Sequence, residues 1–328
     1  MKIYFIATNQ NICVGSYRIW VRDLSRTLNS LGHDCKIVKT VIEIPKEAEM
    51  VILSKNDYHL AESVANTLNC IVGCINLAAD IKNKFIDFII TGSIEESISL
   101  SAYDNVFLYP LIELDYENIS PKQHTENNTI KICFHGHYPH LSKFNPHLKQ
   151  ALEIFAQETK IELHVITGSE NFTWNIGRPN VPIIYKHWNH KNFVHDIQQC
   201  DIGVIPNVTD LNAYIPQLRA TQSRDQGWYH TDYNIRFKNK SNAGRAFVFY
   251  QLGIPVIADL TPSNLHILGD TSCGYCAHNS HSWLRALRQL KSHNLRRKVS
   301  LNARNAFKRL YDPCIWAQKL IEQINGSI

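Results

Sequence analysis

The sequence predicts an α/β protein made of two domains, each built on a parallel β-sheet. Its 328 residues are enough for about two hydrophobic cores. Short apolar strands alternate with helical stretches along most of the chain, which is the pattern of a parallel sheet covered by helices. One polar stretch, residues 119–129, interrupts this pattern and predicts the linker between the domains.

The composition is that of a folded, soluble protein. Hydrophobic residues make up 44% of the chain and charged residues 19%, which excludes the disordered class. No apolar run approaches the roughly 20 residues of a membrane-spanning helix, and the run at the amino terminus is too short for a signal peptide. Nine cysteines in such a chain argue against a disulfide framework. We therefore expect a cytoplasmic protein.

The first domain is expected over residues 1–120. A polar loop with Gly15 and Ser16 separates its first strand from a helix over residues 17–31, whose apolar residues share one face. Strand, loop, helix and strand predict a right-handed βαβ unit. The expected strands are residues 2–8, 35–39, 50–53, 70–75 and 88–91.

Two acidic residues after these strands are candidates for a general base. Ligands of parallel sheets bind beyond the carboxyl ends of the strands. Asp57 follows the strand at residues 50–53 and Asp80 follows the strand at residues 70–75, so either could deprotonate an acceptor hydroxyl. The alternative for each is a helix N-cap without a chemical role.

The second domain is expected over residues 121–312, and an amphipathic helix over residues 313–328 follows it. Its clearest strand, residues 200–206, is apolar and ends at Pro206. Trp188 follows another strand, where its indole could stack on a nucleotide base or pack between a helix and the sheet. The other expected strands are residues 130–134, 163–167, 183–185 and 255–258, with a helix over residues 146–157.

The stretch of residues 233–259 holds the strongest candidate for a binding site. An apolar helix begins near residue 246 and ends at Gly253. Glycine is the preferred residue in the left-handed conformation that often ends a helix. The start of such a helix receives an anion, because its backbone N–H groups are unpaired and the macrodipole is positive there. An ordinary helix–turn–strand unit with solvated lysines is the alternative. The polar residues ahead of the helix are Arg236, Lys238, Lys240, Ser241 and Asn242.

Four motifs along the chain resemble those of GT-B glycosyltransferases, especially the family 4-like enzymes that build bacterial surface polysaccharides. The motifs are GSYR before the first helix, HG followed by a lysine, DIGVIP, and KSN followed by LGIPVIA. The resemblance implies two Rossmann-like domains that face a cleft, with the C-terminal helix crossing back to the N-terminal domain. The glycine loop is not G-x-G-x-x-G, so a dinucleotide site is not expected.

The resemblance also implies a reaction, the transfer of a sugar from a nucleotide-diphosphate-sugar to a glycan or a lipid-linked glycan. Lys240 would stabilise the leaving diphosphate, and Asp57 or Asp80 would act on the acceptor. The implied donor contacts are Gly15, Ser16, Gly136, His137, Lys143, Trp188, Pro206, Arg236, Lys238, Lys240, Ser241 and Asn242.

The sequence departs from the family at positions that matter for the mechanism. His137 stands where the family has an arginine, and an imidazole carries less positive charge than a guanidinium. The two glutamates of many retaining members fall on Lys240 and Val248, so the stereochemical outcome does not follow from the resemblance. The chain has no D-x-D motif, and neither a metal nor another cofactor is expected.

The stretch from Thr271 to Tyr311 is basic and contains no acidic residue. It is either a solvated face or a surface that meets an anionic inner membrane, and reversal of Arg296, Arg297 and Lys298 is expected to weaken such contact. Two other functions stay open, a GT-B nucleotide-sugar 2-epimerase and a non-catalytic polyanion-binding protein. No nucleic-acid-binding motif is present, so no nucleic-acid partner is expected. The basic residues are Arg285, Arg288, Lys291, Arg296, Arg297, Lys298, Arg304, Lys308 and Arg309.

Overall fold

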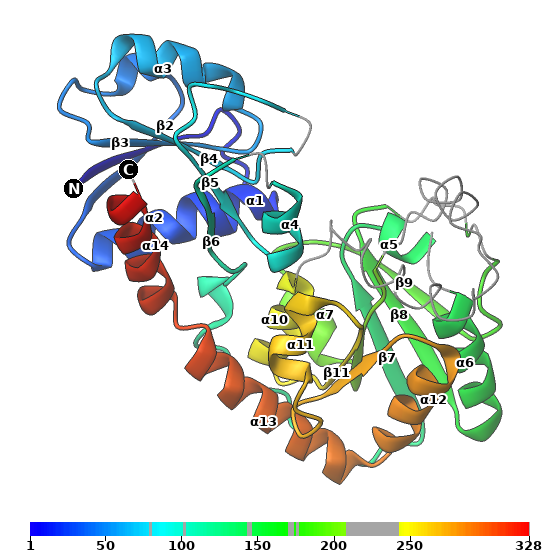
Figure 1. Ribbon diagram of the computed structural model, residues 1–328. Helices are drawn as coiled ribbons and strands as arrows, with labels where there is room; N and C mark the ends of the chain where they lie inside the picture. The colour runs from blue at the N-terminus through cyan, green and yellow to red at the C-terminus, as the bar shows by residue number, and fades with distance from the viewer. Residues whose placement is uncertain are drawn as a thin grey trace, which may run out of the picture. The chain divides into compact units, whose positions relative to one another are not determined.

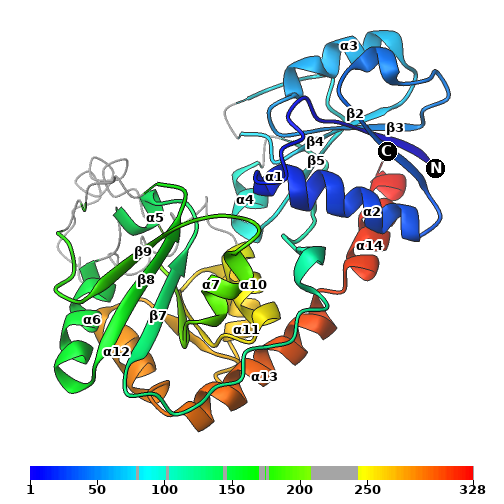
Figure 2. The same cartoon turned by 180° about the vertical axis from the view of Figure 1, so that it is seen from behind.

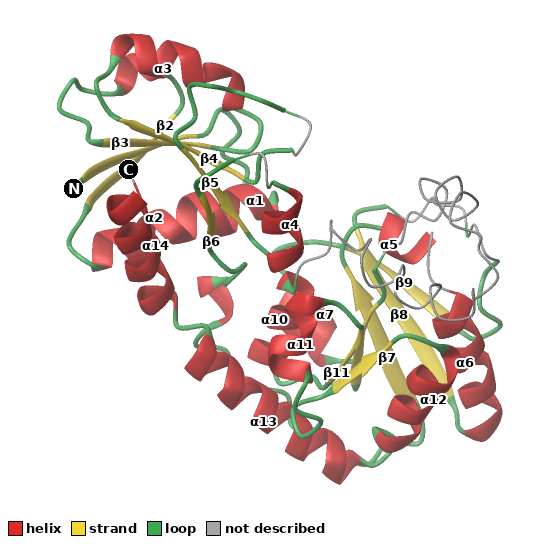
Figure 3. Cartoon of the chain, in the orientation of Figure 1, coloured by secondary structure: helices red, strands yellow, loops and turns green. Residues whose placement is uncertain are grey.

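The computed structural model describes residues 1–78, 81–100, 103–142, 146–169, 174, 177–207 and 243–327. The chain divides into two compact units, one of Met1–Asn118 with Asn242–Gly244 and Lys308–Ile328 and one of Ile119–Ser241 with Arg245–Phe307 (Figure 1). Each unit contains a six-stranded parallel sheet with helices on its faces (Figure 3). The predicted α/β class with two parallel sheets is therefore confirmed. None of the described helices is long and apolar enough to cross a membrane.

The sheet of the first unit has the strand order β2-β1-β3-β4-β5-β6. Its strands alternate side chains between two cores, so that Ile3 and Phe5 of β1 face one core while Tyr4 and Ile6 face the other. The three-residue strand β6 was not predicted. The strands are β1 (Lys2–Ile6), β2 (Asp34–Val38), β3 (Met50–Leu53), β4 (Ile71–Ile75), β5 (Phe88–Thr91) and β6 (Val106–Leu108).

Helices cover both faces of this first sheet. The expected helix over residues 17–31 begins two residues early and consists of α1 (Gly15–Tyr17), a π-helical turn (Arg18–Asp23) and α2 (Leu24–Ser30). The last helix, α14 (Pro313–Ser327), packs on α2 and shares its core, as Figure 1 shows. The predicted return of the C-terminal helix to the N-terminal domain is thus confirmed. The remaining helices are α3 (Ala61–Thr67) and α4 (Ile94–Ser99).

The sheet of the second unit has the strand order β12-β11-β10-β7-β8-β9. The short edge strand β12 was not predicted, and it contains Cys276, whose thiol is not part of a disulfide. The strands are β7 (Ile130–His135), β8 (Ile161–Thr167), β9 (Ile183–His187), β10 (Ile202–Ile205), β11 (Val256–Asp259) and β12 (Tyr275–Ala277).

Helices α6 (Pro146–Glu158) and α12 (Ser280–Gln289) lie side by side in the second unit, as both views show (Figures 1 and 2). They enclose a core that includes Phe134, Phe155 and Trp283. The other helices are α5 (Pro139–Ser142), α7 (Phe193–Gln198), α10 (Gly244–Leu252), α11 (Pro262–Leu268) and α13 (His293–Leu310).

The polar stretch at residues 119–129 packs closely on the second unit. The ammonium group of Lys122 lies 3.5 Å from Asp201 and donates to the Gln198 carbonyl at 3.0 Å. Gly253 has the expected left-handed conformation with a φ of 74°, and a Cβ there would lie 2.6 Å from Pro121. The polar side chains of this stretch therefore form hydrogen bonds and ion pairs with the second unit.

The basic stretch does not form a single solvated face. Arg296 was expected to contribute its charge to the surface, and this expectation was wrong. Arg296 is only 1% exposed, and its guanidinium donates to the carbonyls of Leu290, Lys291 and Thr125. Its charge is therefore turned into the unit, where backbone carbonyls solvate it. Arg288 also has a partner, since its Nε donates to Glu158 Oε2 at 2.9 Å. The exposed cations of the stretch are Arg285, Arg288, Lys291, Arg297, Lys298, Lys308 and Arg309.

Candidate functional site

A candidate site lies at the carboxyl ends of the central strands of the second sheet. Strands β11, β10 and β7 are neighbours and parallel, so the residues after them meet at one edge. Pro206 and Asn207 follow β10, Gly136 follows β7, and α10 begins beside them with Gly244. This edge is where ligands of open parallel sheets bind.

Arg245 is the central side chain of this site. It leaves the first turn of α10, and its guanidinium donates to the Pro206 carbonyl at 3.1 Å and to Asn207 Oδ1 at 2.5 Å. No described carboxylate lies within ion-pair distance of it. Burial lowers the pKa of Arg245 to about 10, against the opposing effect of Asp259, so the group remains charged at neutral pH. Because a helix disfavours a cation in its first turn, this position suits a protein that binds an anion there.

Asn207 supplies a second feature of an anion site. Its side chain is 1% exposed, and its backbone N–H donates to Asp259 Oδ2 at 2.7 Å. Its Oδ1 accepts from Arg245, which fixes the orientation of the amide, while its Nδ2 has no hydrogen-bond partner among the described residues. A buried donor without a partner costs about 1–3 kcal/mol, a cost that a bound oxyanion would remove.

Gly136 makes room for Arg245. Its φ of 124° lies in the region that favours glycine, and a Cβ at this position would lie 2.9 Å from Arg245 Cδ. Gly136 was expected among the donor contacts, through the HG motif. The structure adds a different reason for glycine here, the passage of the arginine side chain.

Two histidines surround the arginine without adding positive charge. Burial lowers the pKa of His135 to about 3, and its Nε2 lies 3.1 Å from the Arg245 carbonyl. Burial, followed by the charge of Arg245, lowers the pKa of His140 to about 3 as well. The Nδ1 of His140 lies 3.5 Å from Arg245 Nη2. Both imidazoles are therefore neutral at pH 7, and Arg245 is the cation of this cluster.

The other predicted residues of the second unit differ in their placement. Pro206 belongs to the site through its carbonyl group. His137 is exposed, and its ring contacts Tyr138 at a centroid distance of 5.2 Å. Trp188 is half-buried, with its ring 5.9 Å from that of Phe193, so part of the indole packs and part stays open.

Asp57 of the first unit is a buried hydrogen-bond acceptor. Its carboxylate accepts from Thr8 Oγ1 at 2.6 Å and from Thr8 N at 3.1 Å, and it also accepts from Ser54 Oγ. It thereby joins the segments that follow β1 and β3. Asp57 occupies the N-cap position of the helical turn Tyr58–Leu60, as the alternative had it, but its side chain makes no capping hydrogen bond there. Its role as a general base stays a prediction.

Gly15 and Ser16 open α1 in the first unit. A Cβ on Gly15 would meet only Arg18 Nη2, at 4.0 Å, so no steric contact requires a glycine. Several other predicted residues lie outside the described part of the chain, and their roles stay predictions. These are Asp80, Lys143, Arg236, Lys238, Lys240, Ser241 and Asn242.

Neither Arg245 nor Asn207 was predicted from the sequence. One signal for Arg245 was available, because an arginine at the second position of a helix opposes the macrodipole and calls for a reason. Asn207 carried no such signal, since an asparagine after a proline also fits an ordinary turn. In the described part of the chain, no group of three or more His, Cys, Asp or Glu residues is arranged to hold a metal ion.

Neither a protein-family model nor a curated protein matches this sequence. Solved structures match it at low identity. A glycosyltransferase from Rickettsia africae ESF-5 has a TM-score of 0.65 at 10% identity and covers 99% of this chain and 98% of its own. T4 phage BGT, solved with its UDP-glucose substrate, has a TM-score of 0.62 at 12% identity, with 99% of both chains covered.

A third match is a mutant of S. aureus TarM, solved in complex with UDP and other ligands. Its TM-score is 0.53 at 12% identity, and it covers 84% of this chain. This chain spans only 55% of that longer protein. These likenesses, together with the two parallel α/β units, show that this chain has the GT-B fold.

Proposed function

We propose that this protein is a glycosyltransferase of the hexosyltransferase type. It would move a sugar from a nucleotide-diphosphate-sugar to a glycan or a lipid-linked glycan. The observation that carries the proposal is Arg245, a charged guanidinium without a described carboxylate partner at the start of α10 in a GT-B fold. The fold alone is compatible with several reactions. A buried cation at the start of a helix, in contrast, indicates that the site binds a ligand with an anionic group.

The proposed reaction needs a positively charged group at this site. A nucleoside diphosphate develops negative charge as the bond between the sugar and its oxygen breaks. Arg245, the first N–H groups of α10 and Asn207 Nδ2 would stabilise that charge from one edge of the sheet. Arg245 would thus replace the arginine that the family has at the position of His137. Lys143, Lys240, Ser241 and Asn242 are expected to add to the same site.

Calorimetric titration with UDP, ADP and GDP tests the proposal directly. Replacement Arg245→Gln removes the charge, so the affinity for the preferred nucleotide is expected to fall by about 1.5–3 kcal/mol, the size of a charged hydrogen bond. Arg297→Gln is the matched control, because Arg297 is exposed and its side chain makes no hydrogen bond or ion pair with a described residue. Arg245→Lys keeps the charge and should retain part of the affinity.

The proposal would be wrong if the folded Arg245→Gln protein bound the nucleotide as tightly as the control. It would also be wrong if no nucleoside diphosphate bound at all. Thermal unfolding of each variant separates a lost contact from a lost fold. The donor that binds best can then be offered as its sugar conjugate, and release of the nucleotide measures the reaction.

We propose that this transfer does not require a metal ion. Cationic side chains and helix N–H groups would do the work that a divalent ion does in other transferases. Excess chelator is therefore expected to leave turnover of the nucleotide sugar within about twofold of the untreated protein. A loss of turnover that manganese or magnesium restores would contradict this assignment.

We further propose that the protein acts in the cytoplasm and visits the inner membrane to reach a lipid-linked acceptor. The support is the set of exposed cations on α13 and just before it. Most basic residues of α13 are not buried, and Arg296 is the buried exception. Such cations are attracted by anionic headgroups. This part of the proposal is independent of the donor site.

A further inference from the structure

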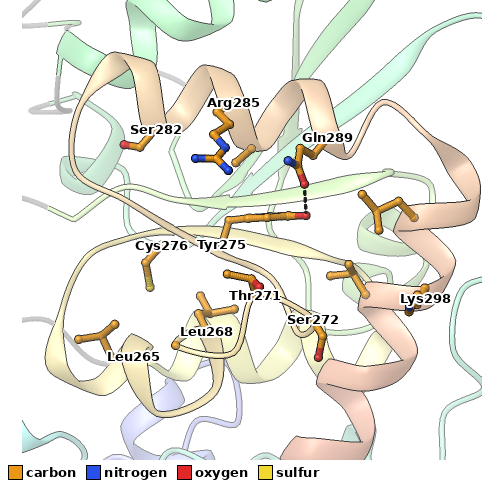
Figure 4. Close-up of a pocket in the computed structure, with 14 residues that line it drawn as sticks. Leu265, Leu268, Thr271, Ser272, Tyr275, Cys276, Ser282, Arg285, Gln289 and Lys298 are labelled. Carbon is orange, nitrogen blue, oxygen red and sulfur yellow. Dashed lines mark hydrogen bonds between the residues drawn. The ribbon is translucent and has the colours of Figure 1, made fainter.

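A separate cavity of about 670 Å³ opens beside the edge strand β12 in the second unit. Helices α11, α12 and α13 supply its other walls (Figure 4). Cavities of about 300–1,000 Å³ are typical of sites for small molecules. None of its lining residues belongs to the candidate donor site around Arg245.

One part of the cavity wall is apolar. Leu265 is 44% exposed and Leu295 is half-buried, whereas Leu268 and Val299, which also line the cavity, are only 2% and 1% exposed. The apolar surface that stays open to water is therefore mainly that of Leu265 and Leu295, and it favours a ligand with an apolar body, since burial contributes about 25 cal/mol per Å².

The other part of the wall is cationic. Arg285 of α12 and Lys298 of α13 are exposed, and neither makes a hydrogen bond or an ion pair with a described residue. Figure 4 shows Arg285 extending from α12 towards Tyr275 of β12, whose hydroxyl donates to Gln289 Oε1 at 2.8 Å. No acidic residue lines the cavity.

The acidic residue closest in sequence is directed elsewhere. Asp270 precedes the cavity residue Thr271, and its Oδ1 accepts from Ser272 N at 2.8 Å. It therefore closes its own turn and does not neutralise Arg285 or Lys298 by an ion pair. The cavity combines two unneutralised cations with an apolar wall.

We propose that this cavity binds an amphipathic anion, with a phosphate or carboxylate group held by Arg285 and Lys298 and an apolar chain against Leu265 and Leu295. A free inorganic anion would leave the apolar wall in water. A neutral apolar ligand would leave two cations beside it without a counter-charge. An amphipathic anion satisfies both parts of the wall.

Calorimetry with short-chain lipids below their micelle concentration tests the site. The probes are dihexanoyl phosphatidic acid, its dibutyryl form, dihexanoyl phosphatidylcholine and inorganic phosphate. Dihexanoyl phosphatidic acid is expected to bind most tightly, with the affinity rising about fourfold for each methylene group that becomes buried. In the variant Arg285→Glu with Lys298→Glu, binding of this probe should fall by at least about tenfold, because two charged contacts are lost.

The matched control is Lys291→Glu with Arg297→Glu, which changes the net charge equally at two exposed positions outside the cavity. Its affinity should stay within about twofold of the unchanged protein. An equal loss in both double variants would show unspecific attraction and overturn the proposal. Phosphate binding as tight as that of the lipid, or no binding of the anionic lipid, would overturn it too.

The proposal does not depend on the proposed sugar transfer. Titration of the same double variants with the preferred nucleoside diphosphate is expected to give unchanged affinity, because the cavity and the Arg245 site share no residue. Vesicles with and without anionic lipid then distinguish a ligand that comes from a bilayer from one that is free in solution. Lipid extraction that Arg285→Glu with Lys298→Glu abolishes would identify the bilayer as the source.

Discussion

At the scale of single residues, Gly136 and Arg245 are paired in the candidate site. The backbone of Gly136 has a φ that other residues rarely adopt, and its missing side chain leaves the space through which Arg245 passes. The position of the guanidinium therefore depends on a residue far away in the sequence. The HG motif indicated Gly136 but gave no connection with Arg245, because only the parallel order of β7 and β10 brings the two residues together.

The first prediction at this scale concerns Gly136→Ala. The new methyl group meets Arg245 Cδ and the backbone conformation becomes strained, so the free energy of unfolding should fall by about 1–3 kcal/mol. Affinity for the nucleoside diphosphate should fall as well, since Arg245 is displaced. Urea unfolding and calorimetry give the two values.

Gly168→Ala is the control for this experiment. Gly168 follows β8, and a Cβ there would meet no atom within 4 Å. The replacement should change the unfolding free energy by less than about 0.5 kcal/mol. Equal effects at the two glycines would contradict the steric argument for Gly136.

At the scale of secondary-structure elements, inner strands of the first sheet were the most predictable. The residues of β3 and β5 match the expected ranges, because strands buried on both faces are continuous apolar runs. Strands β6 and β12 have three residues each, too few for a pattern to stand out. Helix α13 was recognisable as basic, but the sequence could not show that Arg296 donates hydrogen bonds to three backbone carbonyl groups.

The prediction at this scale compares two neighbouring arginines of α13. Arg296→Glu replaces a buried donor by an acceptor and leaves the Leu290, Lys291 and Thr125 carbonyls without it, so unfolding should become easier by at least about 3 kcal/mol. Arg297→Glu changes an exposed side chain and should alter stability by less than about 0.5 kcal/mol. The urea concentration at the midpoint of unfolding measures both effects. Similar midpoints for the two variants would refute the structural role of Arg296.

At the scale of the whole molecule, the remaining charge of the basic stretch bears on where the protein works. The exposed side chains of α13 include Arg297, Lys298, Lys308 and Arg309, together with Leu301, which is 55% exposed. Residues eleven positions apart, such as Arg297 and Lys308, fall on the same side of a helix, since about 3.6 residues make one turn. The exposed side of α13 therefore presents cations around an apolar side chain, a pattern that suits the surface of an anionic bilayer.

The last prediction tests this surface with vesicles. The protein is expected to sediment with vesicles that contain phosphatidylglycerol and not with those of phosphatidylcholine alone, and salt should weaken the binding because it screens exposed charges. Each cation near an anionic surface contributes about 1 kcal/mol, so Lys291→Glu with Arg297→Glu should lower the partition coefficient by at least about tenfold. Arg296 is left unchanged, because its buried guanidinium serves the fold. Equal partition of the protein onto both kinds of vesicle, or unchanged partition of the double variant, would assign these cations to a solvated face and favour a soluble acceptor.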